Sequence, residues 1–246
     1  MNRKYILDTH IHTIACGHGY STINEIAMMA KAENLDLIAI TEHSGFVENA
    51  FFNNIVEIPQ FLYGVEVLKG AELDILDVDG SVSIADKHFD RLDIIIASFH
   101  KKMMMPKSKE ENTKAFINVM RSKKIHILGH IDNEDFPIDF NEVIEEAKVQ
   151  NVIIEINNAS FMESRGRANT KENMIELIKL CLKYEVYISL GSDAHNAWQV
   201  GDFLNIESLV EEINYPAELI VNTDIKLLKK VIKARNELFA NNLIHV

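Results

Sequence analysis

The chain has 246 residues, 47% of them hydrophobic, so it is long enough to bury a sizeable core. Its formal net charge of −12 argues against a long nucleic acid as partner, because such binding depends on neutralising phosphates with Lys and Arg. Two cysteines are too few for a disulfide framework, and we find no apolar leader and no run of membrane-spanning length. These features predict a cytoplasmic protein that has no membrane partner.

Apolar runs alternate with segments of helical periodicity along the whole chain. The runs are continuous, as is typical of parallel strands buried on both faces. We predict strands at residues 4–9, 35–40, 65–72, 92–99, 125–130, 151–157 and 186–192. Helices are expected from the capped start at Ser21-Thr22 to about Asn34, and at 110–122, 139–150, 169–184, 204–213 and 224–241.

This alternation predicts an α/β fold, and no linker or low-complexity stretch divides it. We therefore expect residues 1–246 to form a single domain. Two segments resist assignment. They are residues 44–64 and the Asp/Gly-rich residues 74–83, which could form a turn between short strands.

Nearly every predicted strand ends at a histidine or an acid. Neutral imidazole and carboxylate are the usual ligands of zinc, manganese and iron. Parallel strands that each deliver one such side chain at the same end describe a barrel with a metal site at its mouth. The candidate ligands are His10, His12, His18, His43, Glu72, His100, His130, Asp193 and His195.

The spacing of these residues also suggests how the ligands are shared. His10 and His12 lie two apart on a strand, so their side chains face the same way about 6.6 Å apart along the backbone. Asp193 and His195 repeat this spacing after the last strand. A carboxylate such as Glu72 can bridge two cations. Nine candidates are too many for one ion and ample for two or three.

The order of the motifs resembles that of the polymerase and histidinol phosphatase (PHP) superfamily. Residues 155–161, together with a histidine six residues after His12, are most similar to its single-domain YcdX-like phosphatase branch. The motifs are His10-Ile11-His12, Thr41-Glu42-His43, Gly70-Ala71-Glu72, Phe99-His100, Gly129-His130 and Gly191-Ser192-Asp193-Ala194-His195.

The resemblance implies a distorted (β/α)7 TIM-like barrel with a trinuclear centre at the C-terminal ends of the strands, most often zinc, with manganese or iron as alternatives. It implies one metal held by His10, His12, Glu72 and Asp193, a second held by Glu72, His100 and His130, and a third held by His18, His43 and His195. It further implies hydrolysis of small phosphomonoesters by metal-activated hydroxide, with catalytic contributions from Glu72, Asp193 and His195. Clustered divalent ions are physically suited to that reaction.

The chain departs from the family pattern at two positions. Glu42 stands where Asp is usual, which could move a contact to His43, and Ile131 follows His130 where Pro is frequent. Neither change removes a ligand.

Several neighbours of the candidate ligands could also reach the site. Arg165, followed closely by Arg167, could clamp a substrate phosphate. Glu155 and Asn157 share a facing and could support the metal ligands. Cys16 could bind metal as a thiolate, although we favour a small loop residue because the ligand set is already full.

The three other histidines are predicted to lie outside the metal site. His126 lies four residues before His130, about 13 Å towards the other end of the barrel, and is expected in the core. His88 and His245 lie in polar contexts and are expected on the surface.

Three alternatives to a phosphatase of small monoesters stay open. They are a phosphodiesterase or exonuclease, a histidinol-phosphate phosphatase and a non-catalytic metal-binding protein. The charge of −12 disfavours a long nucleic-acid substrate, and open coordination positions would argue against metal storage. The physiological substrate, the native metal and any homo-oligomer are left undecided by the sequence.

Overall fold

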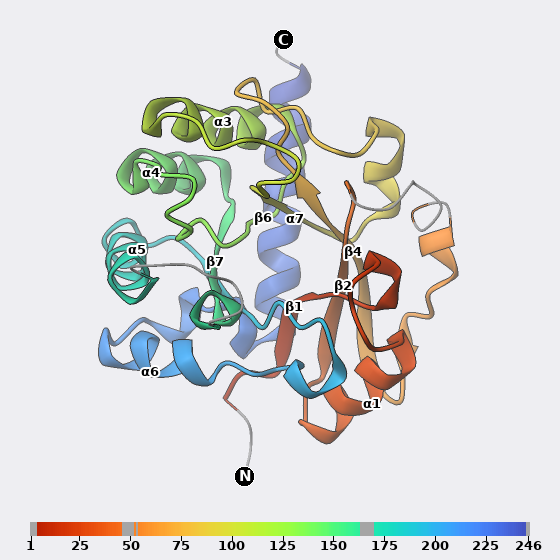
Figure 1. Cartoon of the computed structure of the whole chain (residues 1–246). Helices are drawn as coiled ribbons and strands as arrows, with labels where there is room; N and C mark the ends of the chain where they lie inside the picture. Colours follow the sequence, from red (N-terminus) through yellow and green to blue (C-terminus); the bar gives the residue numbers. More distant parts are fainter. Residues whose placement is uncertain (1–3, 46–51, 53, 163–169, 245–246) are drawn as a thin grey trace.

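The computed structural model describes residues 4–45, 52, 54–162 and 170–244. Seven parallel strands follow one another in the order β1-β2-β4-β5-β6-β7-β8 and curve into a nearly closed barrel (Figure 1). This arrangement confirms the predicted distorted (β/α)7 barrel. The strands are β1 (Leu7–Ile11), β2 (Leu37–His43), β4 (Val65–Asp74), β5 (Ile94–Ser98), β6 (Ile127–Leu128), β7 (Ile153–Asn157) and β8 (Ile188–Gly191).

The helices lie close to their predicted bounds. Side chains cap the starts of three of them: Thr22 and Glu25 form a capping box on α1, Ser108 and Glu111 form one on α3, and Asp139 caps α4. None of the described helices is long and apolar enough to cross a membrane. The helices are α1 (Ile23–Ala32), α3 (Lys109–Ser122), α4 (Phe140–Gln150), α5 (Thr170–Tyr184), α6 (Leu204–Glu212) and α7 (Ile225–Ile244).

Three segments differ from the simple strand–helix pattern. The strand expected at 125–130 is only the two residues of β6, and just before it the imidazole Nδ1 of His126 accepts the Ile95 amide proton. In the unassigned 44–64 segment, the described part holds the short helix η2 (Ile55–Glu57) and β3 (Phe61–Leu62), which pairs antiparallel with β4. Residues 74–83 do form a turn, closed by an antiparallel bridge between Ile75 and Val82.

A side-chain amide joins the first and last strands where the barrel closes. Asn222 is fully buried, and its Nδ2 donates to the carbonyls of Leu7 (2.9 Å) and Leu190 (2.8 Å). Its Oδ1 accepts the Leu190 N–H at 2.7 Å. One residue far along the chain thus pairs backbone groups of β1 and β8 that would otherwise be buried without partners.

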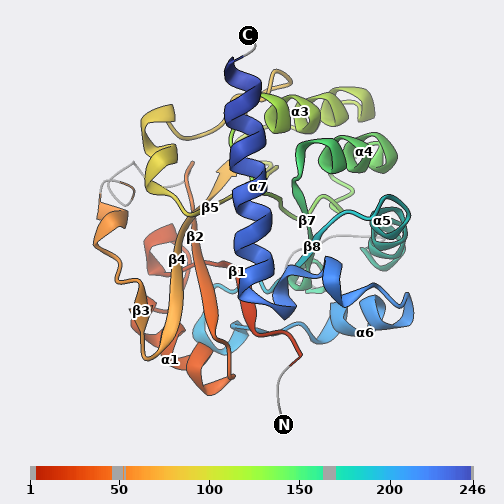
Figure 2. The same cartoon turned by 180° about the vertical axis from the view of Figure 1, so that it is seen from behind.

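Helix α7 closes the end of the barrel at which the parallel strands begin. Leu228 and Val231 of α7 join a buried cluster formed largely by residues at or near the strand starts, such as Leu7 and Leu37. Figure 2 shows α7 running across the strands on this side. The opposite mouth, where the strands end, is therefore the one left open for a site.

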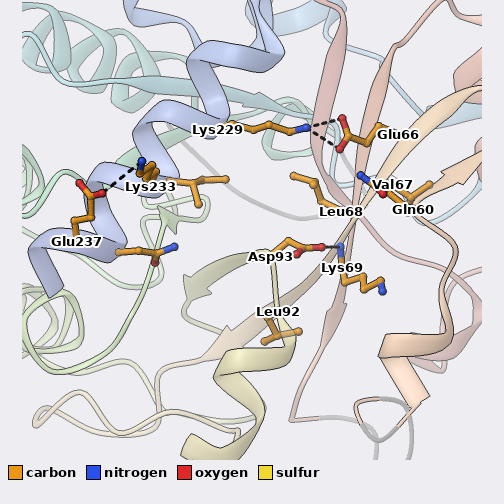
Figure 3. Close-up of a pocket in the computed structure, with 12 residues that line it drawn as sticks. Gln60, Glu66, Val67, Leu68, Lys69, Leu92, Asp93, Lys229, Lys233 and Glu237 are labelled. Carbon is orange, nitrogen blue, oxygen red and sulfur yellow. Dashed lines mark hydrogen bonds and ion pairs between the residues drawn. The ribbon is translucent and has the colours of Figure 1, made fainter. Parts of the chain in front are cut away.

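A cavity of about 720 Å³ lies between α7 and the starts of β4 and β5 (Figure 3). Lys229 contacts both carboxylate oxygens of Glu66 at 2.7 and 2.8 Å, and the Asp93 carboxylate accepts the backbone N–H of Lys69. None of the nine candidate ligands lines it.

The two described histidines outside the ligand set are both buried. His126 is in the core, as predicted: its Nδ1 accepts from the Ile95 N–H and its Nε2 lies 2.9 Å from Asn236 Oδ1. The prediction that His88 is on the surface is wrong. It is 2% exposed, because the short helix η3 (Asp86–Arg91) turns it towards Phe52. His245 lies outside the described residues.

Acidification is expected to destabilise the protein through His126. Burial lowers the pKa of His126 from 6.5 to about 4, so between these values the unfolded chain binds a proton that the folded chain does not. Stability from this group is complete above pH 6.5 and is lost as the pH falls towards 4; by pH 5 the loss is about 2 kcal/mol. Urea unfolding of the wild type and His126→Asn at pH 7.5 and pH 5 should show the difference in their free energies of unfolding shrinking by about that amount. An unchanged difference would contradict the neutral, buried imidazole.

Candidate metal centre

The structure gathers all nine candidate ligands at the open mouth of the barrel. Strand ends supply eight of them, and the ninth, His18, returns from the loop that follows the short helix η1 (Ile14–Cys16). Most of them are buried, whereas His18 is exposed and the side chain of His100 is 21% exposed. Residues far apart in the sequence therefore meet where parallel strands end, as in other barrels of this type.

Four donor atoms surround one point at the centre of this mouth; we call them the first donor set (His10, His12, Glu72 and Asp193). The Nε2 atoms of His10 and His12 are 3.0 Å apart, and each is 3.4 Å from Glu72 Oε2. Asp193 Oδ1 lies 3.4 Å from His12 Nε2 and 3.8 Å from His10 Nε2. Ligands about 2.1 Å from a tetrahedral ion are separated by roughly 3.4 Å, so this spacing fits one cation.

The other oxygen of Glu72 faces the second donor set (Glu72, His100 and His130). Glu72 Oε1 is 2.9 Å from His130 Nε2 and 3.4 Å from His100 Nε2. The two oxygens of one carboxylate thus point at two separate groups of imidazoles. This is the arrangement that a bridging carboxylate requires.

The third donor set (His18, His43 and His195) is less regular. His195 Nε2 lies 2.9 Å from His18 Nε2. His43 instead directs Nδ1 at Glu72 Oε2, at 2.8 Å, and groups closely with His12 and His195. The ring centroids of His18 and His43 are 5.1 Å apart. His43 therefore lies between the first and third sets.

Electrostatics prepare the centre for cations. Burial opposes the charge of Glu72, but the neighbouring imidazoles, led by His100 and His43, hold its pKa well below its usual value. Burial and the nearby His43 lower the pKa of His12 well below its usual value, so that its ring keeps a free lone pair. Burial opposes protonation of His10 too, yet the carboxylates of Glu155 and Glu72 raise its pKa well above its usual value. Anionic Glu72 and neutral His12 are thus in the forms that metals bind, whereas His10 releases a proton when a cation enters.

Glu155 on β7 holds two of the ligands in place from behind. Its Oε1 lies 2.6 Å from His10 Nδ1, and its Oε2 accepts the backbone N–H of His130 at 2.9 Å. Asn157 donates to the same Oε2 at 3.0 Å and to Asp193 Oδ2 at 3.5 Å. These contacts agree with the supporting roles expected for Glu155 and Asn157. A carboxylate that binds Nδ1 of His10 leaves Nε2 of the same ring free for a cation.

Local backbone geometry makes room for this support. A Cβ at Gly191 would collide with the Glu155 carboxylate, so only glycine fits at this point of β8. His130 and Asp193 both have positive φ, of 33° and 52°. Such conformations are strained for residues with a side chain and cluster at functional sites.

Two supporting residues were missed by the sequence analysis. The Oδ1 atom of Asp74 lies 2.7 Å from His100 Nδ1, and Ser98 Oγ donates to Glu72 Oε1 at 2.6 Å. A signal for both was present: Asp74 lies two residues after Glu72 and Ser98 lies two before His100, so each shares its neighbour's facing.

The remaining neighbours are only partly placed. Arg165 and Arg167 lie outside the described residues, so the prediction of a phosphate clamp stays untested. Glu42 is buried and accepts from the backbone N–H and hydroxyl of Thr13, not from His43. Cys16 is a buried residue of η1 beside the centre.

The donor chemistry fits divalent cations. Glu72 Oε2 is buried and accepts no hydrogen bond within the described part of the chain, although imidazole nitrogens surround it. The Nε2 atoms of His10 and His12 and the Oδ1 atom of Asp193 converge on the same point. Donor atoms that converge at 3.0–3.8 Å are stabilised by a cation between them, which displaces any proton that they share.

Glu155→Gln is expected to weaken zinc binding by about 10- to 100-fold, because the neutral amide orients His10 poorly and lowers its basicity. Competition with a chromophoric chelator would measure the change. Glu145→Gln is the control, since Glu145 is exposed on α4 and contacts Tyr184. Equal zinc affinity in both variants would exclude a supporting role for Glu155.

Comparison with known proteins gives the same family. The family model described as PHP domain matches residues 8–188. A protein of Acetivibrio thermocellus named "Probable phosphatase" is 39% identical over 238 residues, covering 95% of this chain and 98% of that protein. A probable phosphatase of Clostridium novyi is 40% identical over 239 residues, covering 96% and 97%. The histidinol phosphate phosphatase of Lactococcus lactis, solved with zinc, L-histidinol and phosphate, superposes with a TM-score of 0.62 at 18% identity, covering 87% of this chain and 95% of that one.

Proposed function

The chain belongs to the PHP domain family, and from that premise we propose that it is a metal-dependent phosphatase that hydrolyses small phosphomonoesters at a centre of three divalent cations. The observation that carries this proposal is the position of Glu72. Its two oxygens contact five imidazoles that come from β1, the residue that follows it, the end of β2 and the segments after β5 and β6. The relatives named as phosphatases support the same reaction class.

When bound, such cations supply a hydroxide nucleophile near neutral pH and offset the charge of the phosphoryl oxygens. The protein's own part is to hold that arrangement. Glu72 keeps the first and second donor sets adjacent. Asn157 contacts Oδ2 of Asp193, which leaves Oδ1 facing the first set and His195 Nδ1, 3.4 Å away. We assign catalytic roles to Glu72, Asp193 and His195 on this basis.

The proposed substrate is a small phosphorylated molecule. The net charge of −12 works against attraction of a long polyanion, whereas a small phosphate ester needs only the local positive charge of a loaded centre. Zinc is the metal we propose first, because seven of the nine donors are imidazoles. Arg165 remains our candidate for contact with the substrate phosphate.

Phosphate release from a panel of small phosphomonoesters would test this function. The protein would be loaded with zinc or manganese and compared with a chelated sample, and the panel would include histidinol phosphate and one simple phosphodiester. Metal-dependent release from monoesters supports the proposal and ranks the substrates. Release only from the diester would indicate a phosphodiesterase, and none from any ester would favour a metal-binding protein without catalysis.

A further inference from the structure

The sulfur of Cys16 lies beside the imidazoles of the third donor set. Cys16 Sγ and ring nitrogens of His18 and His195 all lie within 4.8 Å of one another. Cys16 is 1% exposed although it belongs to the short loop that leads to the exposed His18. The third donor atom that lies close to both His18 and His195 is therefore the Cys16 sulfur. The imidazole of His43 groups with His195 and His12 instead.

The loop backbone directs the sulfur into this position. Gly17 takes the left-handed conformation, with φ of 84°, and ends η1. The Gly19 N–H then donates to Cys16 Sγ at 3.1 Å. A Cβ at Gly19 would collide with the Thr13 carbonyl and lie 3.3 Å from that sulfur. Glycine at 19 thus allows the chain to fold back over Cys16. Burial raises the pKa of the Cys16 thiol, with nearby Glu42 adding to the rise and the Gly19 N–H opposing it, so the thiolate at this place needs a cation beside it.

A second observation at the same sulfur indicates a missing cation. Cys16 Sγ also lies within 4.8 Å of a donor atom each of Glu42 and His12. Glu42 is 1% exposed, and its Oε1 accepts both donors of Thr13, at 2.9 and 2.5 Å. Glu42 Oε2 and His12 Nδ1 are buried and make no hydrogen bond within the described ranges, although the Cys16 backbone N–H lies close enough to the Glu42 carboxyl to favour its charged form. Buried polar atoms left without partners are costly, and a nearby cation offsets that cost.

We propose that Cys16 binds, as a thiolate, the cation held by His18 and His195, and that it makes this position selective for a thiophilic ion such as zinc over manganese. On binding, the S–H bond breaks, its proton passes to water and the sulfur electron pair forms the bond to the ion. Thiolate favours zinc, whereas carboxylate and water suit manganese. This inference rests on the metal centre proposed above.

Cobalt substitution would test the proposal without any assay of activity. A thiolate ligand gives Co²⁺ an intense near-ultraviolet charge-transfer band that imidazole and carboxylate do not produce. The proteins to compare are the wild type, Cys16→Ser and Cys181→Ala. Cys181 is the matched control because it is the other cysteine, is fully buried on α5 and belongs to the apolar core. The cobalt content of each sample would be measured at the same time.

The expected result is a thiolate band in the wild type and in Cys181→Ala, where Cys16 is the only thiol, and none in Cys16→Ser. Zinc affinity at one position should fall about 10-fold or more in Cys16→Ser, with manganese affinity changed less than about threefold. If Cys16→Ser fails to fold, the band in Cys181→Ala alone supports the proposal. Cobalt bound without the band would overturn the role of Cys16 and leave the centre intact. A wild type that binds no cobalt would overturn both.

Discussion

Glu72→Gln is expected to lower phosphatase activity by about 10³-fold or more and to reduce the number of metal ions retained by each chain. The amide keeps the size of the side chain but removes the charge that both donor sets share, with contacts of 2.8–3.4 Å to five histidines. Metal ions contribute several kcal/mol of transition-state stabilisation, and each 1.4 kcal/mol corresponds to a factor of ten. Elemental analysis and phosphate release would be measured on the same sample.

Glu66→Gln is the matched control for this variant. Glu66 lies on the same strand, β4, but six residues earlier and so about 20 Å towards the other end of the barrel, where it pairs with Lys229. Its replacement should leave metal content and turnover near wild type. Full metal content and normal turnover in a folded Glu72→Gln protein would refute the bridged centre.

Removal of the metal ions is expected to lower the melting temperature by roughly 10 °C or more. An ion that binds only the folded chain stabilises it by about 4 kcal/mol when present at 1,000 times its dissociation constant, and each kcal/mol shifts the Tm of a chain this long by about 2–4 °C. Buried Glu72 and Asp193 would lose their counter-charge at the same time. Calorimetry with and without a strong chelator would measure the shift.

Glu72→Gln also serves as the control for chelation. Since this variant is expected to hold fewer ions, chelator should lower its melting temperature much less than that of the wild type. Return of the wild-type value on adding back zinc would show that the loss is reversible. An equal shift in both proteins would mean that the chelator acts elsewhere than at the centre bridged by Glu72.

The strands and the ligand types were predictable because they depend on local sequence. Continuous apolar runs mark buried parallel strands, and a side chain two residues from another on a strand has the same facing. That is why the spacing of His10 and His12, and then of Glu155 and Asn157, was enough to assign each pair to one side of its strand. The same spacing would have identified Asp74 behind His100. The wrong prediction for His88 shows the limit: its neighbours are polar, but a distant aromatic ring, Phe52, packs close to it.

The sequence by itself determined the barrel, the mouth at which the site lies and the set of donors offered there, since periodicity and strand ends are properties of short segments. Only the tertiary structure decided which donors meet. The Glu155 carboxylate reaches His10 across 145 positions, Asn222 joins β1 to β8 across 215 and 32 positions, and Cys16 is brought beside His195 by a loop that folds back. Such contacts depend on strand register and loop path, which no local pattern encodes.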